Sequence, residues 1–221
     1  MVVWVNGAFG VGKSHTAAEL VRRVPGAVLS DPEPVGFSLH RMQPKPLRTD
    51  FQDIAGWRVA IREVIAGVDG DGRWPVVVVP MTIIDETYFD QTVGWLRQHG
   101  HDVRHVALLA SRDTIRRRLR SRLSNIVTDA WALAQIDRCV AALDAPLFAT
   151  QVPTDGLGLA EVVEEVARVT GMRLDRPRLP RWRQGPRRVR VALRLIRHYP
   201  SAMSRSSVVR PIRAIGGLVS W

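Results

Sequence analysis

Short apolar runs alternate along the chain with stretches in which apolar residues recur every three or four positions. The first pattern is typical of buried strands and the second of amphipathic helices. Strands are predicted at residues 2–5, 27–30, 76–79, 103–110 and 148–154. Helices are predicted at residues 13–23, 54–67, 86–98, 112–123, 129–143 and 159–170. This alternation predicts a three-layer α/β/α sandwich with a parallel sheet of about five strands.

Prolines are concentrated between the second predicted strand and the next predicted helix. Pro32, Pro34, Pro44 and Pro46 predict that residues 32–49 are mostly loop. Asp50 then suits the N-cap of the helix that follows, because its side chain can accept a hydrogen bond from a free backbone N–H group.

The formal net charge of +11 is concentrated at the C-terminal end of the chain. Residues 176–221 contain 12 Arg and no Asp or Glu, whereas residues 1–175 hold 20 Lys and Arg against 21 Asp and Glu. We therefore expect a nearly neutral domain over residues 1–175 and a basic linker and tail over residues 176–221. Such a tail is expected to meet an anionic partner, either a membrane surface or nucleic acid.

Cysteine usage and the absence of long apolar segments indicate the compartment. Cys139 is the single cysteine, so an intrachain disulfide is excluded, and we expect it to be a core residue. The N-terminus lacks the features of a signal peptide, and there is no run of about 20 apolar residues. We expect a cytoplasmic protein, either free or peripheral at the inner face of the cell membrane.

The first predicted strand runs directly into a match to the phosphate-binding pattern G-x-x-x-x-G-K-[ST]. The loop consists of Gly7, Ala8, Phe9, Gly10, Val11, Gly12, Lys13 and Ser14. Glycines allow consecutive N–H groups to point at phosphate oxygens, and the following helix adds the positive end of its dipole. We expect Lys13 to reach the β- and γ-phosphates of ATP and Ser14 to bind Mg²⁺. The motif makes the predicted fold a P-loop NTPase sandwich.

Several further segments recur in order after this loop, and the sequence resembles the bacterial tunicamycin-resistance ATP-binding proteins, within the nucleoside-kinase-like and shikimate-kinase-like P-loop group. The similar segments are residues 3–13 (V-W-V-N-G-A-F-G-V-G-K), 31–37, 50–52, 57–58, 79–83, 118–122 and 134–140. The resemblance covers about residues 2–175. It implies ATP-dependent resistance to a tunicamycin-like nucleoside antibiotic, by phosphorylation or by sequestration of the drug.

A kinase also needs a carboxylate near the acceptor hydroxyl. Asp31 follows the second predicted strand, where open α/β sheets bind ligands, and in related small-molecule kinases an Asp at this point contacts the acceptor hydroxyl or a metal-bound water. The alternative is a turn cap before Pro32. An acidic residue is missing after the third predicted strand, where Thr82 stands instead. Thr82 is therefore predicted to hold only a Mg²⁺-bound water.

Arginines on the helix after the fourth strand are predicted to neutralise the transferred phosphoryl group. Arg118 and Arg122 share one helix face and resemble the lid arginines of the kinase group. The alternative is a solvated basic surface. Thr154 and Asp155 follow the last predicted strand, and in the kinase group this loop borders the adenine. A simple turn is the alternative for this pair.

The acceptor pocket is expected to come from residues 33–61. The candidate substrate-binding residues are Phe37, Arg41, Phe51, Gln52, Trp57 and Arg58. Aromatic, cationic and amide groups of this kind suit a uracil ring and sugar hydroxyls. The alternative, favoured for Trp57, is that the aromatic residues belong to the core face of an amphipathic helix.

The tail contains an amphipathic segment at residues 186–199, with arginines opposite an apolar face that includes Leu193 and Ile196. This pattern is typical of a helix that lies on an anionic membrane surface, where Trp182 and Trp221 are candidate anchors. The alternative is a helix that packs on the domain or on a second subunit. Nucleic acid is the least favoured partner, because aromatic residues are not interleaved with the arginines.

The leading hypothesis is therefore an ATP-dependent and Mg²⁺-dependent kinase of a nucleoside antibiotic. Lys13, Asp31, Arg118 and Arg122 are its predicted catalytic residues. The other hypotheses are a membrane-associated protein that sequesters the drug without turnover, and a kinase of an unrelated small metabolite.

Overall fold

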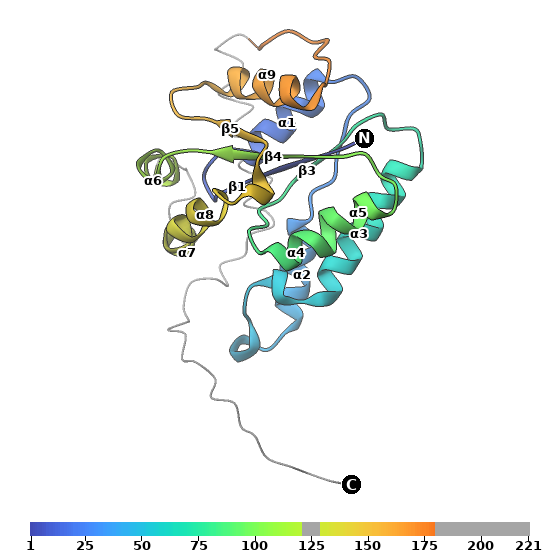
Figure 1. The fold of residues 1–221 in the computed structure, drawn as a ribbon. Coiled ribbons are helices and arrows are strands. Elements are labelled where there is room, and N and C mark those ends of the chain that lie inside the picture. The colour runs from blue at the N-terminus through green and yellow to red at the C-terminus, as the bar shows by residue number, and fades with distance from the viewer. Residues whose placement is uncertain (121–128, 180–221) are drawn as a thin grey trace.

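The centre of the molecule is a parallel five-stranded sheet in the order β2-β3-β1-β4-β5 (Figure 1). The computed structural model describes residues 1–120 and 129–179. The strands are β1 (Val2–Gly7), β2 (Val28–Leu29), β3 (Val77–Pro80), β4 (Val103–Leu109) and β5 (Gln151–Pro153). The predicted fold class and the predicted five-stranded parallel sheet are confirmed.

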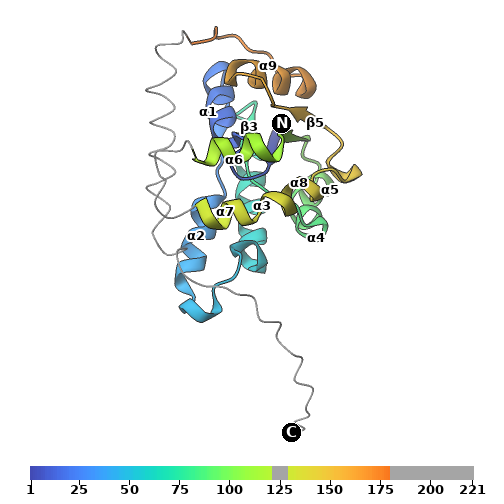
Figure 2. The same ribbon diagram turned by 90° about the vertical axis from the view of Figure 1, so that its left-hand side faces the viewer.

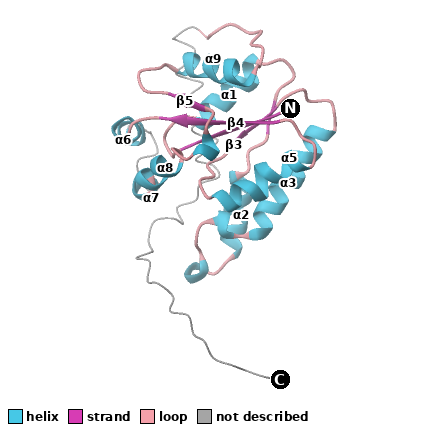
Figure 3. Ribbon diagram, in the orientation of Figure 1, coloured by secondary structure: helices cyan, strands magenta, loops and turns pink. Residues whose placement is uncertain are grey.

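Side chains of β1 alternate between two helical layers, which Figure 3 shows on either side of the sheet. Trp4 belongs to the core cluster under α3 (Ala55–Gly70) and the helical segment 86–98. Val3 and Val5 belong to the cluster under α1 (Lys13–Arg23) and α9 (Leu159–Thr170). All four residues from Val2 to Val5 are fully buried, as expected for a central strand covered on both faces.

A third cluster lies at the end of β1, where three helices cover the phosphate-binding loop. These helices are α6 (Arg112–Arg120), α7 (Asp129–Ala134) and α8 (Ile136–Ala142), which lie near one another in Figure 2. Their buried residues Ile115, Leu119 and Cys139 pack in one cluster with Ala8 of the loop. The nucleotide loop is thus packed on one side by helices that follow β4.

The prediction of a loop over residues 32–49 is wrong for its first half, where the chain forms α2 (Glu33–Met42). The physical reason is the position of the prolines. Pro32 is the N-cap and Pro34 lies in the first turn, where a helical residue needs no hydrogen bond from its own N–H group. Two short 3-10 turns, η1 (Lys45–Leu47) and η2 (Phe51–Asp53), complete the connection to α3.

The predicted helix over residues 86–98 is present, with an irregular middle. It consists of α4 (Glu86–Phe89), a π-helical turn η3 (Asp90–Gly94) and α5 (Trp95–Gln98). The hydroxyl of Thr92 donates to the carbonyl of Tyr88 at 2.7 Å, inside the helix. The predicted helix over residues 129–143 is divided at Gln135 into α7 and α8, and a 3-10 turn, η4 (Pro146–Phe148), precedes β5.

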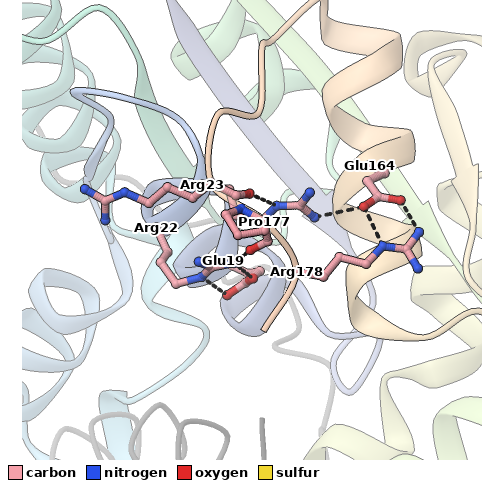
Figure 4. A network of polar contacts seen from close by, with 7 residues as sticks. Glu19, Arg22, Arg23, Glu164, Pro177 and Arg178 are labelled. Carbon is pink, nitrogen blue, oxygen red and sulfur yellow. Dashed lines mark hydrogen bonds and ion pairs between the residues drawn. The ribbon is translucent and has the colours of Figure 1, made fainter. Parts of the chain in front are cut away.

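The chain after α9 folds back over α1 (Figure 4). The N–H groups of Asp175 and Arg176 donate to the carbonyl of Arg23 at 3.0 and 3.3 Å. Arg23 in turn donates to the carbonyl of Arg176 and to the carboxylate of Glu164 on α9. The guanidinium of Arg178 also binds that carboxylate, with Nε at 2.7 Å from Oε1. The start of the predicted basic segment is therefore packed against α1 and α9.

Glu164 should make the stability of the fold depend on pH in the acid range. The hydrogen bond from Arg178 and the nearby Arg23 lower the pKa of Glu164 from 4.5 to about 2. A lowered folded-state pKa stabilises the fold above pH 4.5, and this contribution is lost as the pH falls toward 2. Because the site is partly exposed, we expect on the order of 1 kcal/mol at neutral pH.

Urea unfolding of the wild type and of Glu164→Gln across this pH range would measure the contribution. The two proteins should differ in unfolding free energy at pH 7 and converge as the pH falls to about 2. Glu165→Gln is a suitable control, since that partly exposed carboxylate, within the described part of the chain, forms its ion pair inside α9, with Arg168. A pH-independent difference for Glu164→Gln would contradict the proposed linkage.

Among residues 1–120 and 129–179, no helix has the length and apolar composition needed to cross a membrane. The predicted amphipathic segment at residues 186–199 and the candidate anchors Trp182 and Trp221 lie outside the described residues.

Candidate functional site

The phosphate-binding loop joins the end of β1 to the start of α1 and has the backbone shape that a phosphate cradle requires. Gly10 and Gly12 have φ values of 86° and 116°, which side-chain-bearing residues rarely adopt. A Cβ atom on Gly10 would lie 2.8 Å from Leu119 Cγ, so α6 also requires glycine there. A Cβ atom on Gly12 would meet nothing within 4 Å, so this part of the loop borders open space.

Lys13 is the first residue of α1, and its ammonium group is folded back over the loop. Nζ donates to the carbonyls of Gly7 at 2.9 Å and Ala8 at 3.1 Å, and it lies 5.3 Å from the ring centroid of Phe9. The side chain is only 7% exposed. No acidic residue occupies the first turn of α1, so the positive end of the helix dipole is not neutralised locally. The loop therefore suits an anion such as a triphosphate.

Thr82 lies two residues beyond β3, beside the first glycine of the loop. Its buried hydroxyl donates to the carbonyl of Gly7 at 2.8 Å, so the same carbonyl accepts hydrogen bonds from Thr82 and Lys13. The predicted contact of Thr82 with a metal-bound water stays a prediction. Ser14 is partly exposed next to Lys13 and could ligate Mg²⁺ together with phosphate oxygens. Among the described residues, no group of three or more His, Cys, Asp and Glu could hold a metal ion by itself.

Asp31 lies two residues beyond β2, at the same carboxyl edge of the sheet as the phosphate-binding loop. Its Oδ1 accepts a hydrogen bond from the N–H group of Glu33 at 3.1 Å, which is the turn-capping arrangement that the sequence left as an alternative. The side chain remains partly exposed. Capping and a catalytic role are compatible here, because a carboxylate has two oxygens and about four acceptor positions.

Arg118 connects the phosphate-binding loop to the loop after β5. Its Nη1 donates to the carbonyl of Val11 and to the hydroxyl of Thr154, both at 2.9 Å, and Nη2 donates to the carbonyl of Thr154 at 2.9 Å. Burial lowers the pKa of this guanidinium, and Asp155 opposes that effect. Arg118 thus joins the phosphate-binding loop to the loop after β5. Arg122, the second predicted lid arginine, lies outside the described residues.

Of the predicted adenine-bordering residues Thr154 and Asp155, the second holds the start of α6. Asp155 accepts hydrogen bonds from the N–H group and the hydroxyl of Ser111, at 2.7 and 2.9 Å. A hydrogen bond with Thr114 is the largest cause of the lowered pKa of Asp155. Thr154 is buried, and its N–H group donates to the carbonyl of Leu109 at 2.7 Å. Contact of this loop with adenine stays a prediction.

Three of the predicted substrate-binding residues are aromatic and form one buried cluster. The ring of Phe51 packs edge-on against Phe37 and Trp57, with centroid distances of 5.3 and 5.1 Å. Phe37 and Phe51 are each 6% exposed, and Trp57 is fully buried. The indole N–H of Trp57 donates to the carbonyl of Pro32 at 3.2 Å. The core alternative therefore holds for Trp57, which supports the segment next to Asp31 and offers no surface for stacking.

Replacing Trp57 with alanine should destabilise the fold by about 3–5 kcal/mol, as expected for deleting a large core aromatic group. Trp74, which is 39% exposed, provides a matched control, and Trp74→Ala should change the unfolding free energy by about 0.5 kcal/mol or less. Urea unfolding followed by far-UV circular dichroism measures both variants. A loss below about 1 kcal/mol for Trp57→Ala would contradict the assignment to the core.

The polar members of the predicted pocket lie in different environments. Arg58 is buried, donates through Nε to Gln91 Oε1 at 2.6 Å, and contacts the carbonyl of Gln52. Its guanidinium lies 4.2 Å from the ring centroid of Tyr88. Arg58 therefore joins η2 to the helical segment 86–98. Arg41 is exposed on α2, so of the predicted substrate residues it is the most accessible to a ligand.

One arrangement near the loop was not predicted from the sequence. Asn6 and His105 are buried and hydrogen-bonded to each other directly behind the loop. An asparagine at the end of an apolar strand was the only available signal for this pair.

Asp50, the predicted N-cap, caps the 3-10 turn η2 by accepting from the N–H group of Gln52 at 3.0 Å. Burial raises the pKa of Asp50, and the hydrogen bond from Gln52 and the charge of Arg138 of α8 oppose that shift.

The comparisons with known proteins agree with this geometry. The family model described as AAA domain matches residues 2–146. The tunicamycin resistance protein of Deinococcus radiodurans has a similar structure, with a TM-score of 0.66 and 28% identity over 80% of this chain and 98% of that chain. A search of curated proteins returned no match.

Two sugar- and metabolite-kinase structures share the fold at lower identity. A gluconokinase from Sinorhizobium meliloti 1021 gives a TM-score of 0.54 and 22% identity over 77% of this chain and 91% of that chain. A shikimate kinase from Bacteroides thetaiotaomicron gives a TM-score of 0.51 and 17% identity over 77% of this chain and 98% of that chain. The phosphate-binding loop, its packing helices and these similarities together identify a P-loop protein with a kinase-like fold. The chain belongs to the AAA domain family.

Proposed function

We propose that this protein transfers the γ-phosphoryl group of ATP to a hydroxyl of a nucleoside antibiotic of the tunicamycin class. The substrate class is suggested by the similarity to the Deinococcus radiodurans tunicamycin resistance protein, which extends over 98% of that chain. The reaction type is suggested by the site itself. A phosphate cradle and a partly exposed carboxylate lie at one edge of the sheet, and this combination is what transfer to a hydroxyl requires.

The placement of Asp31 carries the proposal. The strand order puts β2 two positions from β1, with β3 between them. Neighbouring strands are about 4.8 Å apart, so β1 and β2 lie roughly 10 Å apart across the sheet. Leu29 at the end of β2 aligns through Val78 with Val3 of β1, and the chain continues from there to Asp31 at the carboxyl edge. In this proposal a terminal phosphoryl group held by the loop and an acceptor hydroxyl next to Asp31 occupy the space between them. Asp31 would orient the hydroxyl and accept its proton during transfer.

The other roles follow from charge. Lys13 and the N-terminus of α1 would bind the β- and γ-phosphates, and Ser14 would hold Mg²⁺, which shields charge on the phosphate oxygens. Lys13 must then exchange the carbonyls of Gly7 and Ala8 for phosphate oxygens. Arg118 would keep the loop in place through the carbonyl of Val11. Arg41 is the exposed cation on the acceptor side.

Mass spectrometry of tunicamycin after incubation with the protein and Mg·ATP tests the proposal. A mass increase equal to one phosphoryl group, with an equal amount of ADP formed, would support it. Unchanged drug in the presence of demonstrable ATP binding would remove the kinase claim. Parallel incubations with simple nucleosides and amino sugars would identify a different acceptor, if the drug is not the substrate.

A second function, stoichiometric sequestration of the drug, is favoured by one observation. The position after β3 holds Thr82, which carries no charge and donates its hydroxyl to the loop carbonyl of Gly7. A site without a carboxylate there has less charge with which to hold the metal during turnover. Sequestration predicts drug binding at one molecule per chain without ADP formation. Titration of the drug in the presence of a non-hydrolysable ATP analogue distinguishes the two functions.

A further inference from the structure

Asn6, the residue before the first glycine of the phosphate-binding loop, is fully buried and uses every hydrogen-bonding position of its amide. Its Oδ1 accepts from the N–H groups of Gly7 at 2.7 Å and Ile83 at 3.1 Å. Its Nδ2 donates to the carbonyl of Ile83 at 2.7 Å and lies 3.1 Å from His105 Nε2. A primary amide offers two donors and two acceptor positions, so the group is fully satisfied.

These contacts join three separate parts of the sheet behind the loop. Asn6 belongs to β1, Ile83 follows β3, and His105 belongs to β4. Thr82 lies in the same connection as Ile83, and its hydroxyl donates to the carbonyl of Gly7. Both backbone polar groups of Gly7, the first residue of the loop, are therefore held: Asn6 binds its N–H group, and Thr82 and Lys13 bind its carbonyl.

The contacts of Asn6 with Gly7 and Ile83 fix the direction of its amide and thereby the tautomer of His105. Burial, with a smaller contribution from Arg97, lowers the pKa of His105 to about 3, so the ring is neutral at physiological pH. Phe89 and Phe148 pack against it at centroid distances of 5.0 and 5.5 Å. With Nε2 as an acceptor for Nδ2 of Asn6, the ring proton is on Nδ1. Rotation of the amide by 180° would place its NH₂ group against the N–H groups of Gly7 and Ile83.

We propose that Asn6 and His105 are positioning residues for nucleotide binding. They fix the Gly7 peptide and the Thr82 connection in the arrangement from which the rest of the loop follows, so ATP binds a loop that is already ordered. Preorganisation of this kind raises the affinity for ATP, because the loop does not have to be ordered when the nucleotide binds. This inference rests on one part of the proposed function, the binding of a nucleotide at the loop. It does not depend on which molecule accepts the phosphoryl group.

The test measures the dissociation constant for Mg·ATP by isothermal titration calorimetry, together with the melting temperature. We expect Asn6→Ala to weaken ATP binding about 10-fold or more, since the N–H group of Gly7 loses its acceptor. His105→Leu should weaken it several-fold. His105→Gln should restore affinity to within about twofold, because its amide oxygen replaces the acceptor that the ring provides.

Thr170→Val is the matched control, because it should lower the stability of the fold without displacing the phosphate-binding loop. Thr170 is also buried, but its hydroxyl donates to the carbonyl of Val166 within α9, away from the loop. It should lower the melting temperature and leave the affinity for ATP unchanged. A purely structural role for Asn6 and His105 would give the same result as this control.

Equal ATP affinity in the wild type, Asn6→Ala and His105→Leu would overturn the inference. If Asn6→Ala does not fold, the comparison of His105→Leu with His105→Gln decides, and equal affinity in these two variants would also overturn it. Drug phosphorylation plays no part in the measurement. An absent mass shift on the drug, with the affinity changes present, would therefore remove the proposed kinase activity and leave this inference standing.

Discussion

Replacing Lys13 with alanine is expected to lower turnover by about 10²–10³-fold or more, the effect of removing one buried group that stabilises charge in a transition state. Lys13 is 7% exposed, and its ammonium group lies against the carbonyls of Gly7 and Ala8 inside the loop. Affinity for ATP should fall as well, because the same group binds the ground-state phosphates. Phosphorylated drug, quantified by mass spectrometry, and calorimetric ATP binding give the two readouts.

The chain provides its own control for this variant. Lys45 is the second of the two lysines in the sequence and is exposed in η1, so Lys45→Ala removes the same charge from outside the site. It should leave turnover and ATP affinity unchanged. Full activity of Lys13→Ala would mean that the loop does not hold the transferred phosphoryl group in the manner proposed. Lys13→Arg is not expected to restore activity, since a planar guanidinium does not match a site shaped for a compact ammonium.

Replacing Asp31 with asparagine should lower the rate of phosphoryl transfer by about 10²–10⁴-fold, the usual contribution of a positioned general base. Asparagine retains an oxygen that can accept from the N–H group of Glu33, so this turn contact is preserved while the charge and the proton acceptor are lost. ATP affinity should therefore change by no more than about twofold. This separation of turnover from ATP binding distinguishes Asp31 from Lys13.

Asp71 is a suitable reference for the loss of one carboxylate. It lies in the turn that follows α3 and pairs with Arg73, so Asp71→Asn should behave as the wild type. Single-turnover kinetics with excess enzyme would separate the chemical step from product release. A rate for Asp31→Asn within about threefold of the wild type would show that the capping role of this carboxylate is its whole function.

The predictable part of the molecule is the part determined by short-range patterns. The glycines and Lys13 lie within eight consecutive residues, and the preceding apolar strand determines where the loop must lie. Asp31 was predictable for the same reason, because it directly follows a strand. Residues 33–42 were assigned to a loop from their prolines, although a proline in the first helical turn costs nothing.

The acceptor side was less predictable, because helical periodicity shows which residues face inward and not what they face. Trp57 fits an inward position equally well as a pocket wall and as a core residue, and only the packing of Phe51 and the carbonyl of Pro32 decide between them. The pairing of Asn6 with His105 joins residues 99 positions apart and depends on the register of β1 with β4. No local pattern contains that information.

The folding back of the chain over α1 has a geometric consequence for any attachment through the C-terminal segment. α1 starts at the phosphate-binding loop and ends at Arg23, about 16 Å away at 1.5 Å per residue. Arg22 and Arg23 hold the carbonyls of Pro177 and Arg176 at that far end (Figure 4). A bead, sensor surface or fused protein joined directly at residue 179 would therefore be attached near the end of α1 that is opposite the phosphate-binding loop.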